Sequence, residues 1–163
     1  MLETFMGRLS RLCRDQRGTM VIETAIVAPV LVLMSLGAFQ VSSLVARQSE
    51  LDSAAAEGAA IAIASPPNNA AKRTTLQQVI ATSITPAAPA VNNVTVTVSA
   101  AYRCNSATAY VTDPNTCTSG VISNFVKIYI TDIYTPTWVN YGIGSNITYR
   151  TTRYAEYSQT DVP

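Results

Sequence analysis

Histidine is absent from this chain of 163 residues, and glycine and charge are scarce. Without histidine the chain has no Ser-His-Asp or Cys-His nucleophile and no His-ligated metal site. The seven glycines are scattered, so the sequence holds no glycine-rich phosphate loop. A net charge of +1 provides no basic field for nucleic acid. We therefore expect no enzyme, and no metal, cofactor, nucleic acid or small-molecule substrate.

Charge is also missing over one long stretch near the N-terminus. Between Arg17 and Arg47 the chain runs for 29 residues with Glu23 as its one charged side chain. This run exceeds the roughly 20 residues that a helix needs to cross a bilayer. A charge at the centre of such a helix costs roughly 2.5–3.5 kcal/mol on insertion scales, and less near an interface. We expect a transmembrane helix over residues 19–46 in which Glu23 needs a compensating partner.

The residues before this helix indicate its orientation. Residues 1–18 carry four arginines against two acidic side chains, whereas the rest of the chain carries slightly more acidic than basic ones. The positive-inside rule then places this leader in the cytoplasm and the C-terminal domain across the membrane. The apolar run is longer than the about 7–15 residues of a cleavable secretory signal. By itself, the segment is typical of a plain uncleaved signal anchor.

The helical pattern continues beyond the membrane-spanning run. Residues 47–64 are rich in good helix formers, and Ser65-Pro66-Pro67 predicts the end of the helix. We expect one face of this extramembrane half to pack on a domain, while the charged side chains face water. These solvent-facing side chains are Arg47, Glu50, Asp52 and Glu57.

The remaining chain predicts a linker and a β domain. Residues 65–90 read as a linker that contains a short amphipathic helix over residues 72–84. Within residues 91–163, alternating apolar and polar side chains predict strands over 94–100, 125–133 and 146–157. The short connections favour antiparallel order. The expected fold is α+β, a long N-terminal helix covering a three- to four-stranded antiparallel sheet.

Two of the three cysteines bound the connection between the first two expected strands. On the oxidising side of a membrane, Cys104 and Cys117 favour a disulfide, which would stabilise the domain by about 3 kcal/mol in the chain-entropy model. A metal pair is the alternative, but neither histidine nor a CxxC motif supports it. Cys13 lies in the leader on the opposite side, where we favour a free thiol over a lipid-modified one.

An aromatic group precedes the third expected strand. The only tryptophan, Trp138, lies close in sequence to Tyr134, Pro136 and Tyr141. Such a group suits a sugar-binding or surface-binding site. A packed core or loop anchor is the interpretation that we favour.

The residues Arg17-Gly18-Thr19-Met20-Val21-Ile22-Glu23-Thr24-Ala25, followed by Pro29, resemble the N-terminus of the TadE-like proteins of tight-adherence (Flp-type) pilus systems. These proteins are similar to type IV prepilins. In that superfamily an inner-membrane aspartyl peptidase cleaves after the glycine, and a glutamate stands at the fifth mature position. The resemblance implies cleavage between Gly18 and Thr19 and a role in assembly for Glu23. It also implies, as partners, membrane lipid, prepilin peptidase, other pilins or pseudopilins and the Flp pilus assembly machine.

The resemblance has departures that narrow the expected role. Flp-type major pilins usually have an aromatic residue after the glutamate and are much shorter, whereas Thr24 follows Glu23 here. Thr19 also differs from the phenylalanine that tends to begin mature type IV pilins. These differences favour a minor pseudopilin over the main fibre subunit.

The implied function is a minor pseudopilin in the bacterial inner membrane that assembles or initiates an adhesive Flp-type pilus. Cleavage would expose an α-amino group on Thr19, which could neutralise Glu23 of a neighbouring subunit in lipid. Pairing of Glu23 with its own Arg17 is the alternative for that side chain. The alternative function is an uncleaved, signal-anchored periplasmic binding or adhesion module, with the loop around Trp138 as its contact surface.

Overall fold

The computed structural model describes residues 16–84, 94–142 and 144–162. Most of the basic leader, including Cys13, and part of the linker, residues 85–93, lie outside the described residues. The chain divides into two compact units, Met1–Ser43 and Leu44–Pro163. One helix, α2 (Gln16–Ala64), contributes its first part to the first unit and its last part to the second.

In the first unit, α2 is an apolar helix with its side chains exposed. Every side chain over residues 20–39 is exposed, and the most apolar 18-residue window has a mean hydropathy of 2.1. Hydroxyl groups in this part bond within the helix: Thr24 donates to the carbonyl of Met20 and Ser35 to that of Leu31, both at 2.8 Å. This helix is long and apolar enough to cross a membrane.

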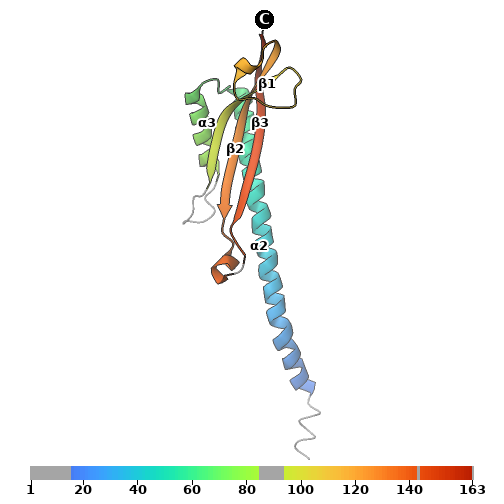
Figure 1. The fold of residues 1–163 in the computed structure, drawn as a ribbon. Helices are drawn as coiled ribbons and strands as arrows, with labels where there is room; N and C mark the ends of the chain where they lie inside the picture. The colour runs from blue at the N-terminus through green and yellow to red at the C-terminus, as the bar shows by residue number, and fades with distance from the viewer. Residues whose placement is uncertain (1–15, 85–93, 143, 163) are drawn as a thin grey trace, which may run out of the picture. The chain divides into compact units, whose positions relative to one another are not determined.

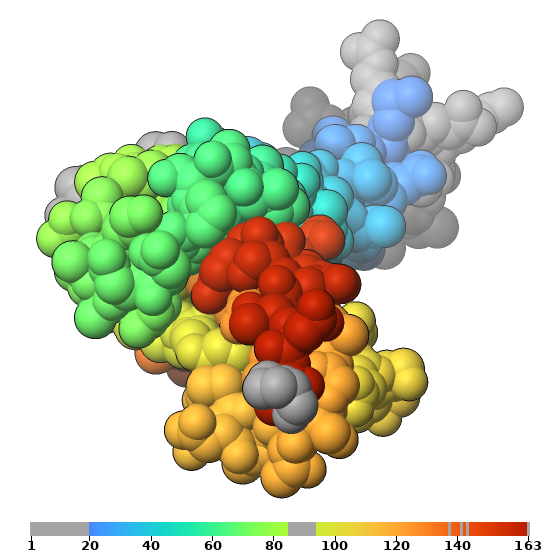
Figure 2. Space-filling view, turned by 90° about the horizontal axis from the view of Figure 1, so that it is seen from above, coloured from blue at the N-terminus to red at the C-terminus, as the bar shows by residue number. Residues whose placement is uncertain are grey.

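In the second unit, the last part of α2 packs on a three-stranded antiparallel sheet (Figure 1). The strands are β1 (Thr95–Cys104), β2 (Gly120–Tyr134) and β3 (Ile147–Val162), in the order β1-β2-β3. A second helix, α3 (Ala70–Ser83), packs beside α2 and contacts β1. Figure 2 shows both helices, in green, on one side of this unit, and the connection between β1 and β2, in yellow to orange, on the other. The expected α+β fold is confirmed.

The core of the second unit lies between the sheet and the two helices. The strands supply alternating residues to it, and each helix supplies one apolar face. Its fully buried large side chains are Leu51, Ile80, Val126, Ile128 and Ile130. The helices approach closely at Gly58, where an added Cβ would lie 2.8 Å from Cγ1 of Ile80 and 3.2 Å from Cδ1 of Ile128.

The elements extend further than the sequence pattern predicts. The first strand continues to Cys104, the second begins at Gly120, and the third reaches Val162. The strands continue through residues that do not alternate cleanly between apolar and polar. They do so because β1 and β3 are each hydrogen-bonded to β2 along their lengths. The short helix begins at Ala70, since the Asn69 side chain caps it by accepting from the N–H of Lys72 at 2.8 Å.

The connection between β1 and β2 is closed by a disulfide. Cys104 and Cys117 are bonded, with their Cα atoms 5.3 Å apart, so the predicted disulfide is confirmed. Asn105 reinforces the closure because its Oδ1 accepts from the N–H of Val121 at 2.8 Å and its Nδ2 donates to the carbonyl of Ser119. Asn105 has a φ of +52°, a conformation that asparagine tolerates better than most residues.

Candidate functional site

The expected processing residues lie at the start of α2. Gly18 and Thr19 fall within its first turns, and the side chains of Arg17 and Thr19 lie outside those that the structure describes. Thr19 and Glu23 are four residues apart, so they lie about one turn from each other on the same helix face.

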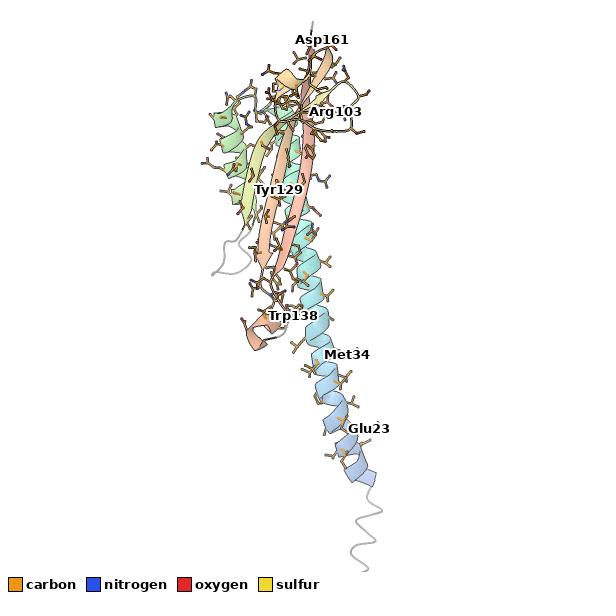
Figure 3. The ribbon with its side chains drawn as sticks, in the orientation of Figure 1. Glu23, Met34, Arg103, Tyr129, Trp138 and Asp161 are labelled. Atoms are coloured by element: carbon orange, nitrogen blue, oxygen red, sulfur yellow. A yellow bond between two sulfur atoms is a disulfide. The ribbon has the colours of Figure 1, made fainter. Side chains whose placement is uncertain are left out.

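Glu23 is exposed on the apolar helix (Figure 3). It borders a shallow apolar groove on the helix surface with Met20, Val27 and Leu31. Glu23 forms no hydrogen bond or ion pair with another residue that the structure describes. The carboxylate is therefore available to a cationic group outside the described part of the chain.

The first charged side chain after the apolar run, Arg47, is buried, and the expectation that it faces water is wrong. Its side chain is 6% exposed, and its Nε donates to Oδ2 of Asp132 on β2 at 2.7 Å. Its Nη1 donates to Oε2 of Glu50 at 2.8 Å. Burial alone lowers the pKa of Arg47, but the hydrogen bonds to Asp132 and Glu50 outweigh it, and the pKa lies above its ordinary value. The guanidinium is charged and joins α2 to the sheet.

A second polar contact follows one turn along α2. Asp52 was also expected to serve as a solvated side chain, yet its Oδ1 accepts from the hydroxyl of Thr151 on β3 at 2.8 Å. Nε2 of Gln48 donates to Oδ2 of Asp52 at 3.2 Å and to Oγ1 of Thr151 at 3.3 Å. Since Thr151 is buried, these hydrogen bonds satisfy a polar group in the interface between α2 and β3.

The start of β3, just after the connection from β2, lies beside the first residue of the second unit. The Tyr149 hydroxyl donates to the carbonyl of Leu44 at 3.3 Å, and the rings of Tyr134 and Tyr149 lie 6.4 Å apart. Burial, then the neighbouring Tyr134 and Asp132, raise the pKa of Tyr149, so this hydroxyl keeps its proton at neutral pH. Trp138 is half-buried in the short helix η2 (Thr137–Tyr141) of this connection (Figure 3).

An aromatic cluster that the sequence did not reveal covers the sheet face opposite α2. The Tyr110 ring stacks on Tyr154 with centroids 4.1 Å apart and meets Phe125 edge-on at 5.1 Å. The Arg103 guanidinium lies 5.1 Å above the Phe125 ring. Tyr110 comes from the disulfide-closed connection, so its position depends on tertiary folding, and no sequence pattern indicated it. The cluster holds this connection against the sheet.

No group of three or more potential metal-ligating side chains occurs among the described residues. The polar groups between α2 and the sheet form hydrogen bonds with one another, which is typical of a structural interface. Among the described residues, the carboxylate of Glu23 and the connection that holds Trp138 remain available to a partner.

The family model of TadE-like proteins matches residues 18–60. The matched segment begins at Gly18, includes Glu23, and ends within the part of α2 that packs on the sheet. Comparisons with curated proteins and with solved structures found no match. The resemblance inferred from Gly18, Glu23 and Pro29 is thus confirmed over residues 18–60, where the chain is similar to the TadE-like proteins.

Proposed function

We propose that the chain is a membrane-anchored minor pseudopilin that helps assemble or initiate a tight-adherence pilus. The TadE-like match supports involvement in such a pilus and a structural role instead of an enzymatic one. In this proposal, residues 1–18 are a cytoplasmic leader, residues 19–46 cross the inner membrane and the second unit lies in the periplasm. The leader is removed between Gly18 and Thr19 by a prepilin peptidase.

The observation that carries the proposal is Glu23, an exposed carboxylate without a described partner on an apolar helix. Holding a carboxylate among acyl chains is costly unless a cation compensates it. Cleavage at Gly18 creates such a cation, because the new α-amino group on Thr19 has a reference pKa of about 7.7–8.0. The amino group of one subunit then pairs with Glu23 of the next, and assembly becomes favourable within the membrane.

The size of the second unit supports a minor subunit. Beyond α2 the chain builds a complete sheet with a second helix and a disulfide. A fibre made mainly of short helical subunits has little use for this domain in every copy. A subunit at the tip or in the initiating complex can present it to partners or surfaces, which fits a role in adhesion and biofilm formation.

The test is the intact mass and N-terminal sequence of the full-length protein purified from membranes with and without prepilin peptidase. We expect a chain that starts at Thr19 only when the peptidase is present. Replacement Gly18→Leu should leave the leader in place under both conditions and serves as the matched control. An intact leader on the wild-type protein in the presence of active peptidase would overturn the processed pseudopilin and favour the uncleaved signal-anchored module.

A further inference from the structure

The connection between β2 and β3 lacks charge altogether. No Asp, Glu, Lys or Arg occurs in the 17 residues between Asp132 and Arg150. The same stretch holds the only tryptophan and three of the eight tyrosines of the chain. Tryptophan and tyrosine combine an apolar ring with a polar N–H or O–H, and they concentrate where membrane meets water. We call the described residues of this stretch, 133–142 and 144–149, the aromatic turn.

The aromatic turn lies beside the residue at which the chain enters the second unit. The hydrogen bond from Tyr149 to the carbonyl of Leu44 fixes one end of the turn against α2. Leu44 lies five residues after the exposed apolar run of residues 20–39. The buried pair of Arg47 and Asp132 comes next, about one helical turn further along α2. The end of the aromatic turn at Tyr149 therefore lies beside Leu44, a statement that depends only on contacts within the second unit.

Helix length places Leu44 in the headgroup layer of a bilayer. A helix that enters the hydrocarbon core at Thr19 leaves this core after about 20 residues, close to Phe39. Leu44 is five residues further, or about 7 Å at 1.5 Å per residue. The headgroup layer on each side of the core is of similar thickness, since the full bilayer measures about 40–45 Å and its core about 30 Å. Groups that touch Leu44 would thus lie in the headgroup layer.

Local hydrogen bonds define the backbone of the turn around Trp138. Pro136 is fully buried and accepts a hydrogen bond from the N–H of Val139 at 3.1 Å. Gly142, with a φ of +75°, then ends η2 and donates to the carbonyl of Val139 at 3.0 Å. Trp138 is half-buried, and its indole N–H has no hydrogen-bond acceptor among the described residues. A Cβ at Gly144 would lie 3.3 Å from that nitrogen, so only glycine leaves the ring this much room.

We propose that the aromatic turn is a second membrane contact, inserted in the phospholipid headgroup layer next to the helical anchor. The ester carbonyls and phosphates of the lipids supply acceptors for the indole N–H of Trp138. The half-exposed Ile133, at 40% exposure, adds apolar surface at the base of the turn. A charge-free aromatic surface at this level suits a lipid interface better than a sugar or a charged protein. The inference rests on the proposed function only in requiring that α2 is embedded in a bilayer.

The single tryptophan makes the proposal directly measurable. The full-length protein is reconstituted in phosphatidylcholine–phosphatidylglycerol vesicles whose acyl chains carry bromine either near the glycerol or near the terminal methyl group. Bromine quenches tryptophan only at short range, so the emission reports the depth of Trp138. We expect strong loss of emission with the shallow bromine and little loss with the deep one. Emission unaffected by either lipid would overturn the proposal.

Two variants with a relocated tryptophan separate this proposal from the anchor itself. Trp138→Phe with Phe39→Trp moves the reporter into α2, where quenching shows that the helix is embedded. Trp138→Phe with Tyr110→Trp moves it to an exposed ring that contacts Phe125. Phe125 is nine residues from Tyr134 on β2, or about 30 Å at 3.3 Å per residue, so this reporter should be unquenched.

The outcomes distinguish the two failures. Quenching at position 39 without quenching at Trp138 would show that α2 is embedded in the bilayer and that the turn is not, which overturns the membrane contact of the turn. Absence of quenching at both positions would show that α2 is not embedded in the bilayer. This result would overturn the proposed function as well. Protection of Trp138 from acrylamide only when a partner pilin is added would assign the turn to a protein contact and likewise overturn the lipid proposal.

Discussion

At the scale of single residues, the most informative side chain is Arg47. A guanidinium removed from water requires charged or hydrogen-bonding partners, and Asp132 and Glu50 provide them. The two carboxylates are unequal, since the Asp132 side chain is 4% exposed and that of Glu50 is 34% exposed. Only one register of α2 against β2 brings Arg47 to Asp132, so the pair specifies how helix and sheet meet.

We expect Asp132→Ala to lower the free energy of unfolding by about 3–5 kcal/mol, because it leaves the Arg47 charge buried without its main partner. Glu50→Ala is the matched control on the same guanidinium and should cost about 1 kcal/mol or less, because that carboxylate is screened by solvent. Urea unfolding of the full-length protein in detergent, followed by Trp138 emission, measures both. Equal losses for the two variants would contradict the assigned roles.

The double variant Arg47→Met with Asp132→Leu tests the same pair from the other direction. Replacing both partners by apolar side chains of similar size removes the desolvation cost together with the attraction. We expect this variant to regain most of the stability that Asp132→Ala loses. If it remains as unstable as the single variant, lost packing and not the loss of the buried ion pair with Asp132 explains the loss.

At the scale of elements, α2 is one continuous helix whose two parts have different surroundings. Its first part exposes apolar side chains all round, as a helix in lipid does. Its last part buries a stripe that includes Leu51, Ala55 and Ala62 against the sheet. Small residues on this stripe, and Gly58 among them, let α3 approach closely enough to complete the core. The change of pattern along the helix marks where the two units meet in sequence.

The disulfide stabilises the connection between β1 and β2 more than it stabilises the pairing of the two strands. Removing both sulfurs by Cys104→Ser with Cys117→Ser should lower the free energy of unfolding by about 3 kcal/mol in the chain-entropy model. The paired register of β1 and β2 should survive, because it extends from Thr95 to Cys104. Thermal unfolding by circular dichroism, with and without reductant, measures the loss.

The control for the disulfide is Cys13→Ser, which removes the third thiol of the chain. This variant should unfold like the wild type under oxidising conditions and should lose stability on reduction to the same extent. A double-serine variant that is still destabilised by reductant would show that the bond between Cys104 and Cys117 does not account for the loss of stability on reduction.

At the scale of the whole molecule, one unit carries a packed core and the other is a single helix with exposed apolar side chains. A surface as large and apolar as residues 20–39 is found in proteins where lipid or another subunit covers it. The lone carboxylate on this surface sets the two possibilities apart. In the proposed function, lipid would cover the apolar side chains, whereas Glu23 would pair with a cation from another subunit.

We expect Glu23→Ala and Glu23→Gln to insert in the membrane normally and to lose co-assembly with partner pilins. Insertion improves or stays the same because the cost of a buried charge disappears, whereas assembly loses its ion pair. Pulldown of co-expressed pilins measures assembly, and carbonate extraction measures insertion. Thr24→Ala is the neighbouring control, because its hydroxyl bonds only within the helix. Normal co-assembly of both Glu23 variants would refute the role of this carboxylate.

Local sequence patterns were sufficient for the elements and their order. The charge-free run, the stop at Ser65-Pro66-Pro67 and the alternation along the strands predicted the long helix and an antiparallel sheet, because each depends on neighbouring residues. The disulfide also followed from sequence, since it closes a single connection between adjacent strands. The family resemblance of the segment with Gly18 and Glu23 was recognisable for the same reason, because its motif consists of near neighbours.

Only the tertiary structure decided which charged and aromatic side chains meet. The ion pair of Arg47 with Asp132 joins residues 85 positions apart, and the bond from Tyr149 to Leu44 joins residues 105 apart. Helical periodicity placed Arg47 on a solvent face, because it carries no information about which strand covers that face. The partners of a buried charge, and the aromatic turn beside Leu44, are consequences of helix and sheet packing that no local pattern contains.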